Sequence, residues 1–94
     1  MNDLVLKWAE ERGLLKAENA PRQMLKLMEE VGELAGAMAK NKQGDIIDAI
    51  GDIQVVLIIL SKQLGIDYKE CLIYAYNEIK ERKGKLINGV FVKD

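Results

Sequence analysis

Apolar and polar positions alternate along this chain with the repeat of an α-helix. Over four stretches the apolar residues recur three and four positions apart, a spacing that places them on one helix face. Glycine, proline and polar residues separate the stretches. The pattern predicts helices over residues 2–12, 22–40, 45–64 and 67–83, with a tail over 85–94. Together they predict an all-α, four-helix bundle-like fold in one domain, residues 1–94, completed by oligomerisation.

Helix boundaries are marked by residues with special backbone preferences. Gly13, Gly65 and Gly84 are suited to end the first, third and fourth helices, because glycine readily adopts the left-handed conformation at a helix C-terminus. Pro21 is suited to the first turn of the second helix. Asp67 begins a capping-box pattern, which predicts the start of the fourth helix.

The second predicted helix has one broad apolar face, which we expect to lie in the core. Its residues are Met24, Leu27, Met28, Val31, Leu34, Ala35 and Met38. Gly32 and Gly36 lie beside this face, and glycine costs a helix about 1 kcal/mol relative to alanine, so we expect a close backbone approach there. After a break in which Gly44 suits a tight turn, the third helix is apolar nearly all round. We expect it to be the central helix, or to be buried by a second subunit.

Composition narrows the possible function classes. The 94 residues are 49% hydrophobic and 31% charged, which excludes a disordered chain, and the net charge of −1 gives no general attraction to nucleic acid or membrane. Cys71 is the sole cysteine, which excludes an internal disulfide. The longest apolar run, 55–60, is too short to cross a bilayer, and residues 1–3 lack a signal-peptide pattern. We therefore expect a cytoplasmic protein, and its small size favours a homo-oligomer, either dimer or tetramer.

Two clusters of carboxylates carry the candidate chemistry. They consist of Glu29, Glu30 and Glu33 on the second predicted helix, and of Asp45, Asp48 and Asp52 on the third. Like charges three or four residues apart cost a helix about 0.2–0.5 kcal/mol per pair. A solvated surface carries that cost without benefit, whereas a cation between the clusters offsets it. The glutamates lie opposite the apolar face, so for them a solvated surface is the favoured interpretation.

The aspartates favour a functional interpretation. Their helix face is acidic at Asp48 and Asp52 and becomes apolar at Val55, Val56 and Ile59. A solvated face does not become buried halfway along a straight helix, so we expect these aspartates at the mouth of a packed interface. Partly buried carboxylates need a base, a donor or a metal as partner. The chain has no histidine, and an all-carboxylate site suits Mg²⁺ or Mn²⁺, which can clamp a polyphosphate and activate water.

Two segments resemble a known family. Residues 26–34 read KLMEEVGEL and residues 48–53 read DAIGDI. They resemble the MazG-like all-α nucleoside triphosphate pyrophosphohydrolases, whose members carry Glu-x-x-Glu on one helix and Glu-x-x-Asp on the next. Residues 76–85 and the tail over 89–93 look like the short, single-domain, phage-type branch. The resemblance implies Mg²⁺-dependent hydrolysis of (d)NTPs between the α and β phosphates, which yields a nucleoside monophosphate and pyrophosphate.

The resemblance also implies roles for individual residues. Glu30 and Glu33 match the first pair and Asp52 matches the final Asp, so these three are the expected catalytic and metal-binding residues. The remaining family Glu falls at position 49, where this chain has Ala49. Asp48, on the same helical face as Asp52, is the expected substitute metal ligand. This departure puts the number of bound metals in question.

Five further residues are candidates for substrate binding. The resemblance implies that Asn77, Lys80 and Lys83 meet metal and phosphates, although lysines near a helix C-terminus also complement the helix dipole. Trp8 suits a base-stacking platform, but a tryptophan buried in helix packing is the commoner case. Gln23 is implied as a base or sugar contact, and without the resemblance it reads as surface.

Two functions from different classes therefore follow from the sequence. The main hypothesis is a nucleoside triphosphate pyrophosphohydrolase. The alternative is a non-catalytic helical oligomerisation or interaction module that uses the apolar third helix, and Ala49 is the residue that favours it. A DNA-binding helical domain is disfavoured, because the chain has no basic stripe.

Overall fold

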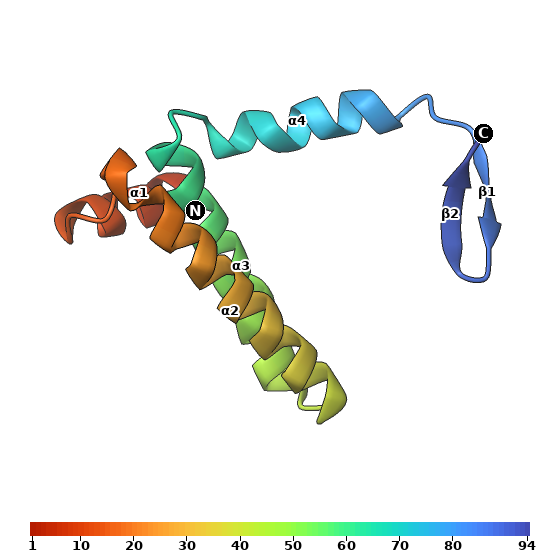
Figure 1. Ribbon diagram of the computed structural model, residues 1–94, viewed down its shortest axis with the longest axis horizontal. Coiled ribbons are helices and arrows are strands. Elements are labelled where there is room, and N and C mark those ends of the chain that lie inside the picture. Colours follow the sequence, from red (N-terminus) through yellow and green to blue (C-terminus); the bar gives the residue numbers. More distant parts are fainter.

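The computed structural model describes residues 1–94 (Figure 1). Its helices are α1 (Asn2–Glu11), α2 (Ala20–Ala39), α3 (Gln43–Gln63) and α4 (Tyr68–Ile79), with a short 3₁₀ helix, η1 (Ala17–Asn19), before α2. Two strands, β1 (Gly84–Ile87) and β2 (Val90–Lys93), pair as an antiparallel hairpin. The all-α fold with four helices is confirmed, and the hairpin lies in the segment predicted as a tail.

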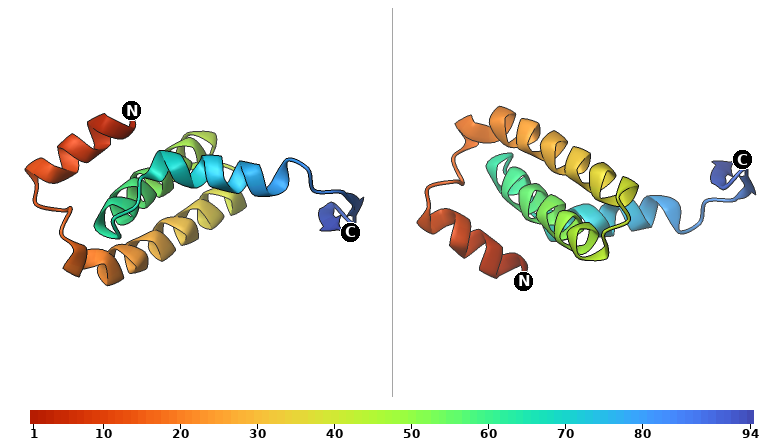
Figure 2. Two further views of the ribbon diagram at one scale, coloured as in Figure 1. Left: turned by 90° about the horizontal axis from the view of Figure 1, so that it is seen from above. Right: turned by 90° about the horizontal axis from the view of Figure 1, so that it is seen from below.

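The core lies around α3, which packs against α2 on one side and α1 on the other (Figure 2). Helices α2 and α3 run antiparallel and are joined by residues 40–42. The buried residues are Ala9, Glu30, Ala37, Ala49, Val56, Ile58, Ile59 and Gln63. Most of them belong to α3, and this confirms its predicted place as the central helix. None of the helices combines the length and apolarity that crossing a membrane requires.

Several predicted boundaries are confirmed by the backbone. Gly13 and Gly65 adopt φ of 71° and 74° directly after α1 and α3, the left-handed conformation that glycine tolerates best. The Asp67 side chain accepts a hydrogen bond of 3.0 Å from the Lys69 amide at the start of α4. This bond satisfies one of the backbone donors that a helix leaves unpaired at its N-terminus.

The expected end of the fourth helix and the turn at Gly44 were wrong. Helix α4 ends at Ile79 rather than at 83, and Gly84 begins β1. Lys80 and Lys83, three residues apart, would repel each other in a continued helix, whereas the hairpin pairs the backbone that follows them. Gly44 lies inside the first turn of α3, and Asn41, with φ of 54°, makes the turn instead. Asparagine is among the few residues other than glycine that tolerate this conformation.

The apolar face predicted for the second helix divides into two stripes. Leu27 and Leu34 face α3 together with Ala37 and the buried Glu30, whereas the remaining large residues of that face stay exposed. The exposed ones are Met24, Met28, Val31 and Met38. At 100° per residue the two stripes lie roughly a quarter turn apart. Packing against α3 therefore uses only part of the apolar surface of α2.

No segment of the chain approaches Gly32 or Gly36, contrary to the prediction from their helix cost. A Cβ atom placed on either glycine would meet nothing within 4 Å. Both glycines are exposed on α2, and Gly36 lies at an open groove between α2 and α3. The close approach that the sequence suggested does not occur within a single copy.

One buried hydrogen bond ties the segment between α1 and η1 to α3. The Gln63 side-chain amide donates to the Leu14 carbonyl oxygen at 2.7 Å, and Gln63 is buried. Changing Gln63 to alanine leaves that carbonyl without its donor, which is expected to lower the free energy of unfolding by about 1–3 kcal/mol. Urea denaturation measures the change. Gln54→Ala, on the exposed face of α3, is the control and is expected to change the free energy of unfolding little. If both variants lose the same free energy of unfolding, the hydrogen bond between Gln63 and Leu14 does not stabilise the fold.

Candidate metal centre

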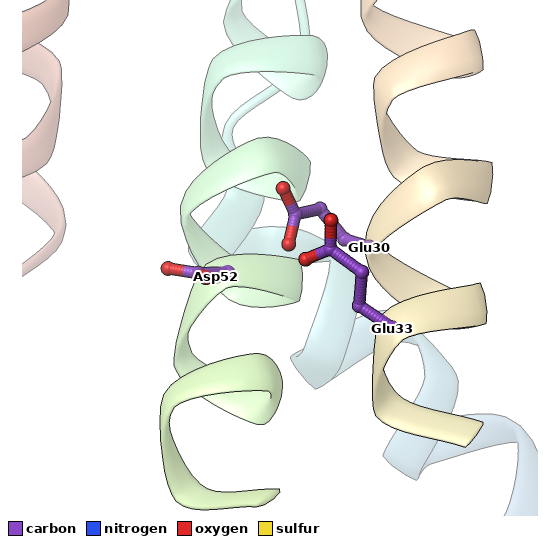
Figure 3. A group of neighbouring side chains, drawn as sticks. All are labelled: Glu30, Glu33 and Asp52. Carbon is purple, nitrogen blue, oxygen red and sulfur yellow. The ribbon is translucent and has the colours of Figure 1, made fainter. Parts of the chain in front are cut away.

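Three carboxylates from α2 and α3 lie close together. Glu30 and Glu33 project from neighbouring turns of α2 toward α3, which carries Asp52 (Figure 3). Each of the three offers one oxygen, and these oxygens lie within 4.8 Å of one another. The antiparallel packing of α2 on α3 brings the two acidic segments to the same level. The structure thus brings together the three residues that the sequence predicted as catalytic.

Glu30 is the buried member of this cluster. Its exposed fraction is 6%, because it lies on the stripe of α2 that packs against α3. The Lys26 ammonium lies 3.4 Å from its Oε1, one turn earlier on the same helix. Its Oε2 is buried and has no hydrogen-bond partner. A buried carboxylate oxygen without a hydrogen-bond partner is costly, and a bound cation would satisfy it.

The two other carboxylates hold their protons more tightly than free side chains do. The negative charge of Glu30 raises the pKa of Glu33 above its usual value. For Asp52, burial raises the pKa first, and the charges of Asp48 and Glu30 raise it further. The Lys26 ammonium acts in the opposite direction on both pKa values and is too weak to cancel the shifts. The site therefore has a deficit of positive charge, which a divalent cation would supply.

An acidic groove of about 350 Å³ opens beside the cluster. Its lining comprises Glu33, Gly36, Ala37, Lys40, Asp45, Asp48, Ala49 and Asp52. Asp48 is exposed and lines this groove with Asp52, although it is not among the three closest carboxylates. Ala49 is buried at the groove, where a longer acidic side chain would enter the space between the helices.

An apolar cleft of about 400 Å³ lies on the other side of Asp52, between α1 and α3. Its lining comprises Leu4, Val5, Trp8, Asp52 and Val55. The Trp8 ring is 46% exposed rather than buried in helix packing, and the Arg12 guanidinium lies 4.3 Å from its centre. Asp52 therefore borders both an acidic groove and an apolar, aromatic cleft.

The other predicted substrate-binding residues lie away from the cluster. Gln23 is half-buried on α2, two turns before Glu30, and lines neither the groove nor the cleft. Asn77 lies on α4, and Lys80 and Lys83 follow it. Helix α4 leads away from the α2–α3 pair (Figure 1), so a single copy does not bring these three residues to the carboxylates.

Sequence reasoning missed three residues that the structure places at the site. Lys40 lines the acidic groove and Lys26 pairs with Glu30, while Arg12 lies over Trp8. Lys26 lies four residues from Glu30, and Arg12 lies four residues from Trp8. This spacing puts both side chains of each pair on one helix face. That spacing was a usable signal. For Lys40 the sequence offered none, because its place depends on how α2 and α3 pack.

The raised pKa of Asp52 predicts a gain of stability on neutralisation. Its pKa is higher in the folded chain than in the unfolded one, so folding is favoured when Asp52 is protonated and loses that support as the pH rises through the raised pKa. In EDTA at pH 7, Asp52→Asn is therefore expected to melt at a higher temperature than the unchanged protein. The difference should close as the pH is lowered past the raised pKa, because the native carboxyl then also carries no charge.

Asp45→Asn is the matched control for this melting experiment. Asp45 lines the same groove from the first turn of α3 and is exposed. Thermal unfolding followed by circular dichroism measures both variants. If Asp52→Asn unfolds at or below the midpoint temperature of the unchanged protein at pH 7, the charge of the Asp52 carboxylate does not destabilise the fold.

Comparison with known proteins gives two matches. Residues 24–89 match the MazG-like family, a span from the second turn of α2 to the turn of the hairpin. A protein of Haemophilus phage HP1 (strain HP1c1), described as an uncharacterized 18.2 kDa protein in the rep-hol intergenic region, is 51% identical over 61 residues. The aligned part is 65% of this chain and 37% of the phage protein, so it spans little more than a third of that relative. No solved structure matches the chain.

Proposed function

The protein belongs to the MazG-like family, and on that premise we propose that it is a Mg²⁺-dependent nucleoside triphosphate pyrophosphohydrolase. The reaction cleaves a (d)NTP between its α and β phosphates and gives a nucleoside monophosphate and pyrophosphate. Family membership supports a nucleotide pyrophosphatase type of function. The substrate, the metal and the residue roles are our proposal.

The buried, unpartnered Oε2 of Glu30 is the observation that carries the proposal. It lies in a cluster of three carboxylates whose oxygens come within 4.8 Å of one another. Carboxylate oxygens are the ligands that Mg²⁺ and Mn²⁺ prefer, and no histidine or buried thiol is present to favour another metal. The residues present therefore fit a hard divalent cation.

The proposed metal ligands are Glu30, Glu33 and Asp52, with Asp48 as a fourth from the groove wall. A bound Mg²⁺ supplies the positive charge that phosphates need and lowers the pKa of a coordinated water. The chain's own part is to hold these carboxylates in place. Glu30 is fixed by its burial and by Lys26, and Asp52 is fixed by the packing of α3 between α1 and α2.

Asp52 also links the two halves of the proposed substrate site. It lines both the acidic groove and the apolar cleft that contains Trp8. A nucleotide has a charged end that requires cations and an aromatic end that requires an apolar partner. We place the phosphates at the groove and the base against Trp8. Arg12 and Lys40 then offer positive charge on either side of Asp52.

Roles for Gln23, Asn77, Lys80 and Lys83 also belong to the proposal. Gln23 shares the α2 stripe of Glu30 and would reach a substrate that extends along that helix. The basic residues after α4 would neutralise phosphates only if they came from another copy of the chain, because their own copy holds them away from the groove.

The test is a panel of ribo- and deoxynucleoside triphosphates assayed for pyrophosphate with Mg²⁺, with Mn²⁺ and with EDTA. We expect pyrophosphate and the matching monophosphate from at least one nucleotide, only when a metal is present. Release of single phosphates, or turnover that persists in EDTA, would contradict the proposed reaction. The panel also identifies the preferred base and sugar.

One observation favours a second candidate function, a non-catalytic helical oligomerisation module. Large apolar side chains stay exposed along α2, α4 and the hairpin, which is typical of chains that bind a partner. Ala49, in place of the expected acidic residue, is compatible with a site that has lost part of its metal ligands. The nucleotide panel distinguishes the two functions, because the module releases no pyrophosphate from any nucleotide.

A further inference from the structure

A two-point contact joins Arg12 to Trp8 at the end of α1. The Arg12 guanidinium lies 4.3 Å from the centre of the indole ring. Its Nη1 also donates a hydrogen bond of 2.9 Å to the backbone carbonyl oxygen of Trp8. The Trp8 side chain is nevertheless 46% exposed, so the contact holds an aromatic ring that the core of the protein does not cover.

The end of α1 explains why the guanidinium reaches the Trp8 backbone. In a continuing α-helix the Arg12 amide would donate to the Trp8 carbonyl oxygen, four residues earlier. Helix α1 ends at Glu11, and the Arg12 amide donates to the Ala9 carbonyl oxygen at 3.2 Å instead. The Trp8 carbonyl is thus one of the acceptors that a helix leaves unpaired at its C-terminus, and the Arg12 side chain satisfies it.

The contact with Arg12 leaves one face of the indole ring free. Side chains of a helix lean toward its N-terminus, so Arg12 reaches back over Trp8, and Trp8 leans toward Leu4, one turn earlier. Leu4 and Trp8 line the apolar cleft beside Asp52, whereas Arg12 is not part of its lining. The ring surface that lines the cleft is therefore not the surface that Arg12 covers.

The cleft offers a flat ligand little besides this ring. Of its five lining residues Asp52 alone is charged, and the proposed function assigns Asp52 to the metal. Leu4, Val5 and Val55 give apolar contact without a preferred plane, whereas an indole face fixes the plane of a stacked heteroaromatic ring. The orientation of Trp8 therefore decides how a nucleobase lies relative to the carboxylates.

We propose that Arg12 is a positioning residue of the nucleotide site, which holds the Trp8 ring so that its free face meets the base in the cleft. This role rests on the proposed function, because it takes the ligand to be a nucleotide. Arg12 acts through Trp8 and makes no contact with the base or the phosphates. A ring that is held before the ligand arrives loses less side-chain entropy on binding, which corresponds to about a threefold to tenfold change in Kd.

Isothermal titration calorimetry with a non-hydrolysable nucleoside triphosphate and Mg²⁺ measures the effect on binding. Arg12→Met is expected to raise Kd about threefold to tenfold. In hydrolysis it should raise KM and leave kcat unchanged, because Arg12 contacts no metal ligand and no reacting atom. Lys7→Met is the matched control, since it removes the same charge from the exposed surface of α1, and it should change Kd by less than about twofold.

A double-mutant cycle determines whether Arg12 acts through the ring. Trp8→Leu removes the stacking surface and is expected to raise Kd about fivefold to a hundredfold. In the Trp8→Leu chain, Arg12→Met is expected to change Kd by less than about twofold, because no ring is left to hold. If Arg12→Met weakens binding equally with and without Trp8, Arg12 acts on the nucleotide itself, and the positioning role is wrong.

The fluorescence of Trp8 reports on the ring directly, because the chain has no other tryptophan. In the ligand-free protein Arg12→Met is expected to lower the fluorescence anisotropy, since the ring then rotates freely. Arg12→Lys keeps a cation that can lie over the ring and should restore part of the anisotropy and of the affinity. A contact that only caps α1 would lower the melting temperature of Arg12→Met and leave Kd unchanged, and this result overturns the proposal.

The outcomes separate the role of Arg12 from the proposed function. If the unchanged chain binds the nucleotide with Mg²⁺ and Arg12→Met binds it equally well, the proposed function stands and Arg12 has no positioning role. If the unchanged chain neither binds the nucleotide nor releases pyrophosphate, the proposed function fails and the role of Arg12 fails with it. Circular dichroism verifies that each variant keeps the helix content of the unchanged chain.

Discussion

Changing Glu33 to glutamine, or Asp52 to asparagine, is expected to abolish pyrophosphate release while the helix content stays the same. Each change removes one oxygen ligand from a cluster whose oxygens lie within 4.8 Å of one another. A catalytic metal contributes several kcal/mol of transition-state stabilisation, and about 1.4 kcal/mol corresponds to a tenfold change in rate. Misplacing the metal should therefore reduce kcat/KM by at least about a hundredfold, measured as pyrophosphate released with saturating Mg²⁺.

Glu29→Gln is the matched control for these variants. Glu29 has the same charge and lies on the same helix, but it is exposed and lies outside the cluster. Its activity is expected to stay within about twofold of the unchanged protein, which is the range for a surface change that touches no ligand. Full activity in both Glu33→Gln and Asp52→Asn would remove this site from consideration.

The sequence predicted the parts of this fold that depend on local preferences. Gly13 and Gly65 end helices because their backbone must turn left-handed, and Asp67 begins one because its side chain accepts a backbone hydrogen bond. The central place of α3 followed from its apolar residues on every side. The cluster of Glu30, Glu33 and Asp52 was likewise predicted from spacing and from the resemblance to a family.

What the sequence did not predict depends on packing between helices. Helical spacing places Glu30 opposite the broad apolar face, so the sequence favoured a solvated surface for it, yet Glu30 is buried against α3. The reason is that α3 contacts a stripe of α2 that includes Leu27 and Leu34 and leaves Met28 and Met38 exposed. A helical wheel gives the angle of each residue but not the angle at which a partner docks.

The hairpin was missed for a different reason. Residues 84–93 carry strand-forming residues such as Val90 and Val92, but their pairing depends on the turn that Asn88 and Gly89 make with positive φ. Asn-Gly between apolar runs is a strong hairpin signal. The segment was predicted as a tail, because it follows the last helix of the four-helix pattern and its Asn-Gly signal was not used.

Magnesium together with a non-hydrolysable nucleoside triphosphate is expected to raise the melting temperature by about 10–20 °C. A ligand that binds only the folded chain at a hundred times its Kd stabilises it by about 2.7 kcal/mol. For a domain of this size each kcal/mol shifts the midpoint by about 4–8 °C. Differential scanning calorimetry at fixed protein concentration measures the shift, because a self-associating chain also melts in a concentration-dependent way.

The origin of this stabilisation lies in the charge that the folded chain leaves uncompensated. Glu30 has a buried oxygen without a partner. The charge of Glu30 raises the pKa of Glu33, and burial, followed by the charges of Asp48 and Glu30, raises the pKa of Asp52. A divalent cation removes this repulsion only in the folded state, where the three oxygens lie together. Asp52→Asn should therefore melt higher than the unchanged protein in EDTA and gain less from metal and nucleotide. If millimolar Mg²⁺ and nucleotide leave the midpoint of the unchanged protein where EDTA leaves it, the cluster binds no cation and the oligomerisation module is the better account of the chain.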